Sequence, residues 1–105
     1  WDEDADGVVQ IGTLTVGVDG TGHDVKLFGD TSGKYMLWDE SADELVLSGT
    51  IKIKEQSSAD TDTAGFGQLW VKTETPNTLQ FTNDAGVDAA LASTGKSIAM
   101  ALVFN

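Results

Sequence analysis

The hydrophobic residues of this chain come in short alternating runs, separated by clusters of Gly, Asp and Ser roughly every 8 to 12 residues. This spacing is typical of an all-β sandwich, prism or barrel built from short antiparallel strands and hairpins. No window has the period of an α-helix. The pattern predicts strands over Val8–Val16, Asp24–Phe28, Lys34–Trp38, Glu44–Leu47, Ile51–Lys54, Gln68–Lys72, Thr78–Thr82 and Ser97–Phe104.

The segments between the predicted strands carry Gly, Asn and Asp, which take positive φ or bond their own backbone in turns. The long polar stretch Glu55–Thr63 has neither Gly nor Pro, and we interpret it as a mobile loop or a linker. The domain organisation predicted is an acidic N-terminal segment, 1–13, and a single β domain, 14–105, with two hairpin-like halves, 14–54 and 64–105. Because the chain starts at Trp1, we expect it to continue an upstream region of a longer or processed polypeptide.

The two halves share a weak internal repeat. Leu37-Trp38 is followed by Leu45-Val46-Leu47, and Leu69-Trp70 is followed by Leu79-Gln80-Phe81. Both patterns predict a β-hairpin with an aromatic residue on its first strand. The sequence leaves open whether this is a duplicated unit or a likeness between two hairpins.

Three of the predicted strands are apolar on both faces, namely those that contain Tyr35–Trp38, Gln68–Val71 and Ser97–Phe104. A small antiparallel sheet normally keeps one face in water, so these strands are either central or covered by another subunit. We therefore expect an oligomer, while a monomeric sandwich with Ile98–Phe104 as its central strand is the alternative. The predicted core or interface residues are Trp38, Trp70, Ile98, Met100, Leu102 and Phe104.

Charge narrows the classes of partner. The chain has 105 residues with 17 acidic and 6 basic side chains, and its net charge is −11. All the basic residues are lysines, so the phosphate contacts and arginine-based readout of a nucleic-acid binder are not expected. Anionic membrane surfaces are excluded as partners by the same sign of charge. Because 40% of the residues are hydrophobic, the chain is expected to fold.

The sequence offers little for catalysis. Nucleophilic mechanisms need a base beside the nucleophile, and the chain has a single histidine, His23, in a Gly-flanked turn, and no cysteine. A glycosidase-type pair of carboxylates stays open, but the acidic residues cluster in predicted loops, where solvated surface charge is the better interpretation. We expect no enzyme and no cofactor.

Two binding hypotheses are weighed against structural roles. The first half of a calcium-binding loop is matched by Asp2, Asp4, Asp6 and Gly7. The twelfth position of that loop, where a glutamate is expected, is Thr13. An acidic terminus is therefore the preferred interpretation, and calcium binding stays open. Trp38 and Trp70 form a possible sugar-stacking platform. Core or interface packing is preferred for both because each lies inside an apolar strand.

Three stretches of the chain carry a specific combination of short motifs. They are Leu14–Gly29 with Thr31–Ser41 and Leu45–Gly49, then Gly67–Lys72 with Thr75–Gly86, and finally Thr94–Phe104. As a set, they resemble structural proteins of tailed bacteriophages, particularly marine and cyanobacterial ones. The resemblance covers most of the chain from Leu14 onward.

The proteins that the chain resembles have no defined catalytic residues, so the resemblance implies no active site in this chain. It implies a non-enzymatic, β-rich component of the virion exterior, either a fibre module or a capsid-decorating subunit, with the fibre favoured. It further implies a homotrimer in contact with other virion proteins. A host-surface or carbohydrate-binding β module is the alternative.

Overall fold

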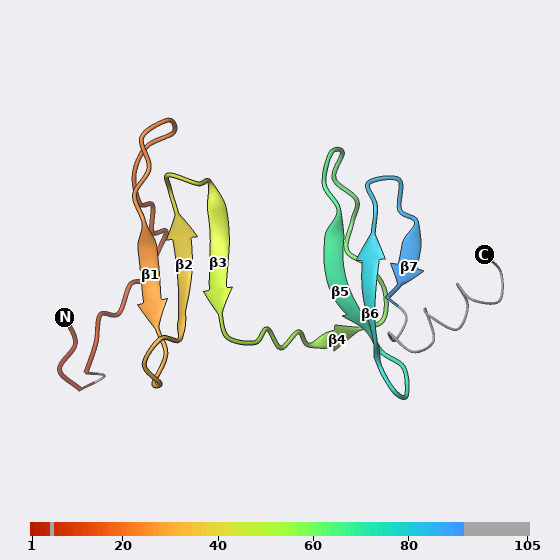
Figure 1. The fold of residues 1–105 in the computed structure, drawn as a ribbon, viewed down its shortest axis with the longest axis horizontal. Helices are drawn as coiled ribbons and strands as arrows, with labels where there is room; N and C mark the ends of the chain where they lie inside the picture. Colours follow the sequence, from red (N-terminus) through yellow and green to blue (C-terminus); the bar gives the residue numbers. More distant parts are fainter. Residues whose placement is uncertain (5, 92–105) are drawn as a thin grey trace. The chain divides into compact units, whose positions relative to one another are not determined.

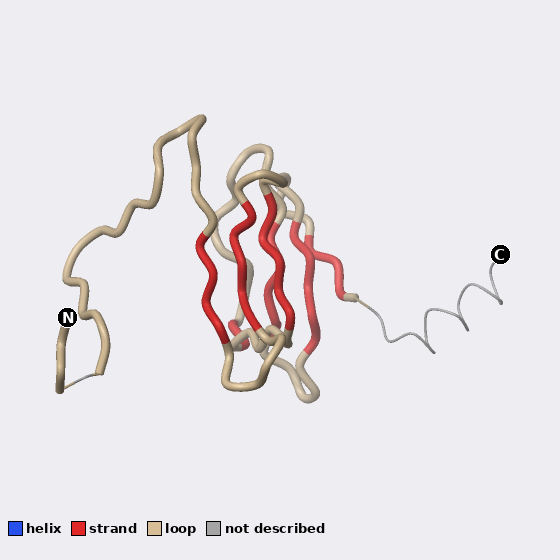
Figure 2. Tube along the Cα trace, turned by 60° about the vertical axis from the view of Figure 1, so that its left-hand side comes forward, coloured by secondary structure: helices blue, strands red, loops and turns tan. Residues whose placement is uncertain are grey.

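The computed structural model describes residues 1–4 and 6–91, which form two β-sheets and contain no helix. The chain divides into two compact units, one ending at Ile51 and the next beginning at Lys52, and each unit holds one sheet (Figure 1). Figure 2 shows the same strands in red between loops in tan. The prediction of an all-β fold is confirmed.

The first sheet is an antiparallel meander of β1 (Val25–Phe28), β2 (Tyr35–Asp39) and β3 (Glu44–Ser48), with β2 in the centre (Figure 1). Turn chemistry sets its connections. Between β1 and β2, Gly33 has a φ of +84°, a conformation that glycine adopts without steric cost. Between β2 and β3, the Asp39 carboxylate accepts a hydrogen bond from the Ser41 hydroxyl at 2.9 Å.

The second sheet has the order β4-β5-β6-β7, formed by Glu55–Gln56, Gln68–Lys72, Thr78–Thr82 and Asp88–Ala90. β5, β6 and β7 pair antiparallel, whereas the short β4 pairs parallel with β5. The two predicted hairpins are both present, as β2–β3 and as β5–β6. The tip of the second hairpin contains a cis peptide bond between Thr75 and Pro76.

The predicted strand Val8–Val16 is wrong. These residues form no strand, and the side chains of Val8, Ile11 and Leu14 are exposed. Gly12, with a φ of +124°, interrupts the extended backbone. An alternating run becomes a strand only when a neighbouring strand accepts its backbone hydrogen bonds, and among the described residues none pairs with this segment.

The predicted strand Ile51–Lys54 is also wrong, because pairing begins immediately after it, at β4. The polar stretch 55–63, interpreted as a loop, thus starts with two strand residues. Glu55 lies opposite Val71 and Gln56 opposite Lys72, and the Thr73 N–H donates to the Gln56 carbonyl at 2.9 Å. The short β7 was not predicted. The predicted strand Ser97–Phe104 lies outside the described residues.

The buried core belongs to the second unit. Among the described residues, the buried side chains are those of Trp70, Gln80 and Thr82, all on β5 and β6. The described part of the first unit contains no buried side chain. The two sheets therefore differ in how far each is stabilised by its own unit.

Candidate functional site

The first sheet carries one wholly apolar face. Side chains alternate between faces along a strand, and residues opposite one another in the register share a face. Trp38 lies opposite Val25 and Leu45, and Met36 lies opposite Leu27 and Leu47. We call the face made by these six residues the β1–β3 apolar face: Val25, Leu27, Met36, Trp38, Leu45 and Leu47.

The β1–β3 apolar face is open. Its six side chains are between 38% and 62% exposed, with Trp38 at 43%. The face carries no charged or hydrogen-bonding group other than the Trp38 indole N–H. A continuous apolar surface of this kind usually marks a contact site, because isolated apolar side chains are common on surfaces but contiguous patches are not.

The opposite face of the same sheet is mixed and partly buried. It carries Lys26, Asp39 and Glu44 among apolar residues, and the side chains of Tyr35, Leu37 and Val46 on it are half-buried. The Lys26 ammonium lies 4.2 Å from the centroid of the Tyr35 ring and 5.0 Å from that of Phe28. The charge on this sheet is thus segregated to one side, and the apolar face is left neutral.

A cavity of about 390 Å³ adjoins the β1–β3 apolar face at Trp38. Two turns form its wall, and the Glu40 N–H at one of them donates to the Asp24 carboxylate at 2.8 Å. Besides the tryptophan, the lining residues are Val18, Asp19, Gly20, Gly22, Glu40 and Asp43. The cavity therefore combines one aromatic ring with three carboxylates.

The second sheet also has an apolar face, which we call the β5–β7 apolar face: Leu69, Val71, Leu79, Phe81 and Ala89. Leu69 and Phe81 are exposed on it. Gly67 lets the Phe81 ring lie close to the backbone, since a Cβ at position 67 would stand 2.5 Å from two ring carbons. Glu55 on β4 shares this face beside Val71, so its edge is charged.

The other face of the second sheet buries polar residues around Trp70. The Trp70 indole N–H donates to the Thr82 hydroxyl at 2.7 Å, and that hydroxyl donates to the Asp88 carboxylate at 2.7 Å. Trp70 and Thr82 are 3% and 1% exposed. We call these two hydrogen bonds the polar relay. Its central hydroxyl accepts one bond and donates the other, so the buried indole N–H has a hydrogen-bond partner.

Residues 58–60 are held by hydrogen bonds to glutamine side chains on the same face of the second sheet. The Gln68 amide accepts from the Asp60 N–H at 2.9 Å and donates to the Asp60 carbonyl at 3.1 Å. The Gln56 amide donates to the Ser58 carbonyl at 2.7 Å and to the Asp60 carboxylate at 3.1 Å. These bonds hold part of the polar stretch 55–63 against β4 and β5.

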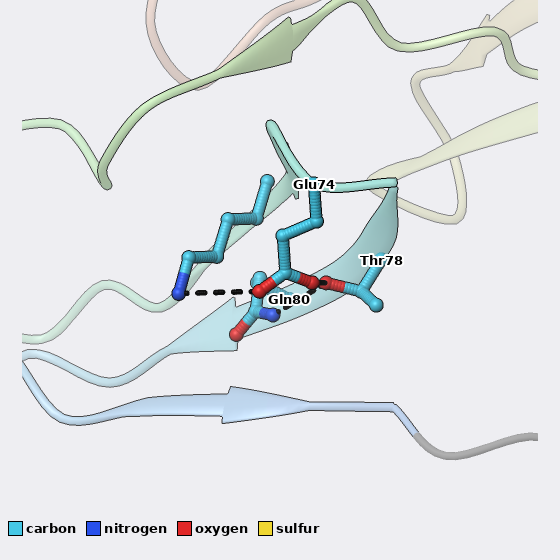
Figure 3. Close-up of polar contacts among 4 residues, drawn as sticks. Glu74, Thr78 and Gln80 are labelled. Carbon is cyan, nitrogen blue, oxygen red and sulfur yellow. Dashed lines mark hydrogen bonds and ion pairs between the residues drawn. The ribbon is translucent and has the colours of Figure 1, made fainter. Parts of the chain in front are cut away.

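A third polar cluster lies at the tip of the β5–β6 hairpin (Figure 3). The Thr78 hydroxyl donates to the Glu74 carboxylate at 2.8 Å, and the Lys72 ammonium lies 3.4 Å from the other carboxylate oxygen. The Gln80 amide donates to the Thr78 hydroxyl at 2.9 Å. The hydrogen bond from Thr78, followed by the hydrogen bond and then the charge of Lys72, lowers the pKa of Glu74 below its ordinary value.

The structure separates the two tryptophans predicted as core or interface residues. Trp38 lies on an exposed apolar face, whereas Trp70 is buried in the second unit and hydrogen-bonded. The other four, Ile98, Met100, Leu102 and Phe104, lie outside the described residues. Sequence reasoning missed Thr82 and Asp88 as partners of Trp70, although Gln68, Gln80 and Thr82 all fall at the alternate positions that share its face.

The acidic N-terminus forms a small closed turn. The Asp2 and Gly7 backbones exchange hydrogen bonds, and the Asp4 N–H donates to the Asp2 carboxylate at 3.0 Å. In the described part of the chain, no group of three or more His, Cys, Asp or Glu residues is arranged to hold a metal ion. The predicted turn residue His23 is exposed in the coil that precedes β1.

Residues 1–4 and 6–91 include no helix long and apolar enough to cross a membrane. Comparisons of the chain with protein-family models, with curated proteins and with solved structures found no match. The resemblance to phage structural proteins therefore stays a prediction, and the β1–β3 apolar face is the main guide to function.

Proposed function

We propose that this chain is a non-enzymatic structural protein on the exterior of a tailed-phage virion. In this proposal it assembles as a homotrimer, forms a module of a fibre rather than a capsid-decorating subunit, and contacts other virion proteins. The β1–β3 apolar face is the observation that supports a structural role most strongly.

The argument begins with what the first unit lacks. A three-stranded sheet needs a covered hydrophobic face to compensate for the conformational entropy lost on folding. Across residues 1–4 and 6–51 no side chain is buried, although the sheet offers six apolar side chains on one face. Contact with another subunit would supply the missing cover.

The distribution of charge agrees with this role. Acidic residues are concentrated in the turns, such as Glu40 and Asp43 between β2 and β3, while the β1–β3 apolar face carries none. A net charge of −11 keeps separate copies soluble before they assemble. An uncharged face allows contact without bringing carboxylates together.

The direct test is the position of the protein on a purified particle. An antibody raised against the isolated chain, or imaging at side-chain resolution, is expected to place it outside the capsid shell, at repeated sites with threefold symmetry. A particle that lacks the protein, or that holds it only inside the shell, would contradict the proposal.

A carbohydrate-binding module is the second candidate, and one observation favours it. Trp38 is half-exposed and lines the cavity of about 390 Å³, a volume within the range of small-ligand pockets, roughly 300–1,000 Å³. Trp70 is buried, so Trp38 is the tryptophan that this hypothesis requires.

Binding to a panel of cell-surface glycans separates the two candidates. Trp38→Ala is compared with Leu45→Ala, which alters the same face at a residue that does not line the cavity. Glycan binding that is lost only in Trp38→Ala, with an unchanged melting temperature and an unchanged oligomeric state, would establish the second candidate. Absence of binding by the wild type contradicts it.

A further inference from the structure

The β1–β3 apolar face is a surface that the side chains of the first unit leave uncovered. We propose that its occupant is the same face of further copies of this chain, so that the central strand β2 of each copy lies nearest the shared axis. This inference rests on the proposed function only in its expectation of an assembly, and it names the surface through which the copies meet.

Charge favours a second copy over a basic protein as the occupant of this face. The chain is strongly acidic, so a basic partner would be drawn to its charged turns rather than to a neutral face. Two copies of an acidic chain approach at least cost through a surface without charge. The β1–β3 apolar face meets that condition, whereas the opposite face carries Lys26, Asp39 and Glu44.

The area of the face is enough for a contact between copies. From the exposed fractions, its six side chains present about 500 Å², which is within the range for the largest apolar patch of a monomer, roughly 300–600 Å². Two such faces in contact would remove about 1,000 Å² from water, the smallest total expected of a specific interface.

The second sheet has less need of this contact. Its unit already buries Trp70 and Thr82 and satisfies them with hydrogen bonds. Its β5–β7 apolar face also has Glu55 at one edge. Packing several copies through that face would bring these carboxylates together, so the β1–β3 apolar face is the better choice.

Cross-linking tests the face directly, because the chain has no cysteine of its own. Met36→Cys places a thiol on the apolar face of the central strand, and Leu37→Cys places one on the opposite face of the same strand. A bis-maleimide linker about 10 Å long matches the spacing of packed sheets. We expect at least fivefold more two-chain product from Met36→Cys than from Leu37→Cys, with the difference lost on dilution.

Further variants keep the test decisive. Leu47→Cys, opposite Met36 in the register, should cross-link like Met36→Cys, and its control is Val46→Cys; this pair replaces the first if Met36→Cys does not fold. Leu69→Cys reports on the β5–β7 apolar face. Equal yields within both pairs, or a higher yield from Leu69→Cys, would overturn the inference.

The outcome is independent of where the protein resides. Cross-linking through Met36→Cys by a protein that is absent from the virion would contradict the proposed function and leave the interface intact. A protein found on the virion whose thiols at positions 36 and 47 do not cross-link would retain its proposed function and lose this interface.

Discussion

The two Leu-Trp hairpins look alike in sequence but place their tryptophans in opposite settings. In β2–β3, Trp38 shares its face with Met36, Leu45 and Leu47, and that face is exposed. In β5–β6, Trp70 shares its face with Gln68, Gln80 and Thr82, and that face is buried. The adjacent leucines are reversed as well, since Leu37 is half-buried and Leu69 is exposed.

This contrast shows that burial and hydrophobicity are separable. The second sheet buries a mainly polar face because each buried group finds a hydrogen-bond partner, as in the relay from Trp70 through Thr82 to Asp88. The first sheet leaves its most apolar face open. One unit is completed by its own polar contacts, and the other is completed, in our proposal, by further copies of the chain.

The largest expected difference between the hairpins comes from truncating each tryptophan. Trp70→Ala is expected to lower the free energy of unfolding by about 3–5 kcal/mol, since it empties a packed site and leaves the Thr82 hydroxyl without its donor. Trp38→Ala should cost less than half of that in dilute protein and more as concentration rises. Urea unfolding followed by circular dichroism measures both; equal costs in dilute protein would remove the contrast.

The polar relay is tested by Thr82→Val, which keeps the side-chain shape and removes the hydroxyl. The expected loss is about 1–3 kcal/mol, because a buried indole N–H then lacks an acceptor. Thr50→Val, at an exposed position outside the strands, is the matched control. Similar stability of the two variants in thermal unfolding would show that the relay contributes nothing.

The packing of Phe81 is tested by Gly67→Ala. The added methyl group would stand 2.5 Å from the Phe81 ring, so the ring must move, at a cost of about 1–2 kcal/mol. Gly22→Ala in the first unit is the control, because its Cβ would meet Glu40 at an ordinary 3.6 Å. Equal melting temperatures for the two variants would contradict the close approach of Phe81 to the backbone.

The smallest effect concerns the hairpin tip that Figure 3 shows. The pKa of Glu74 is lower in the folded chain than its ordinary value of 4.5. Its ionised carboxylate therefore stabilises the fold at pH values above 4.5, and this contribution is lost as the pH falls through the pKa of the folded chain. NMR titration of Glu74 should show its pKa rising in Thr78→Val, because the hydrogen bond from Thr78 is the largest single cause, and rising also in Lys72→Met, which removes the hydrogen bond and the charge of Lys72. An unchanged pKa in Thr78→Val would contradict this cause.

Sequence patterns predicted the strands whose partners are near neighbours. β5 and β6 have their predicted bounds, and β1, β2 and β3 lie within one residue of theirs at each end. Alternation failed for Val8–Val16 because it shows that a strand is possible but not that a partner exists. It missed β4 because Glu55 and Gln56 become strand residues only through pairing with Val71 and Lys72.

The candidate site was predictable in part. Trp38 was identified as a packing residue, but the face that it belongs to follows from the register, which brings together residues from three strands. The difference between Trp38 and Trp70 follows from their neighbours, because Trp38 lies opposite Val25 and Leu45, whereas Trp70 lies opposite Gln80 and donates to Thr82. Period-2 alternation alone does not pair one strand with the next.

The central claim, that copies of this chain associate to complete the first unit, is tested most directly by the mass of the wild-type protein in solution. Sedimentation equilibrium at micromolar concentration is expected to give a trimer of about 33 kDa, three times the chain mass of 11.1 kDa, that dissociates on dilution. A mass of 11.1 kDa at every concentration would contradict it.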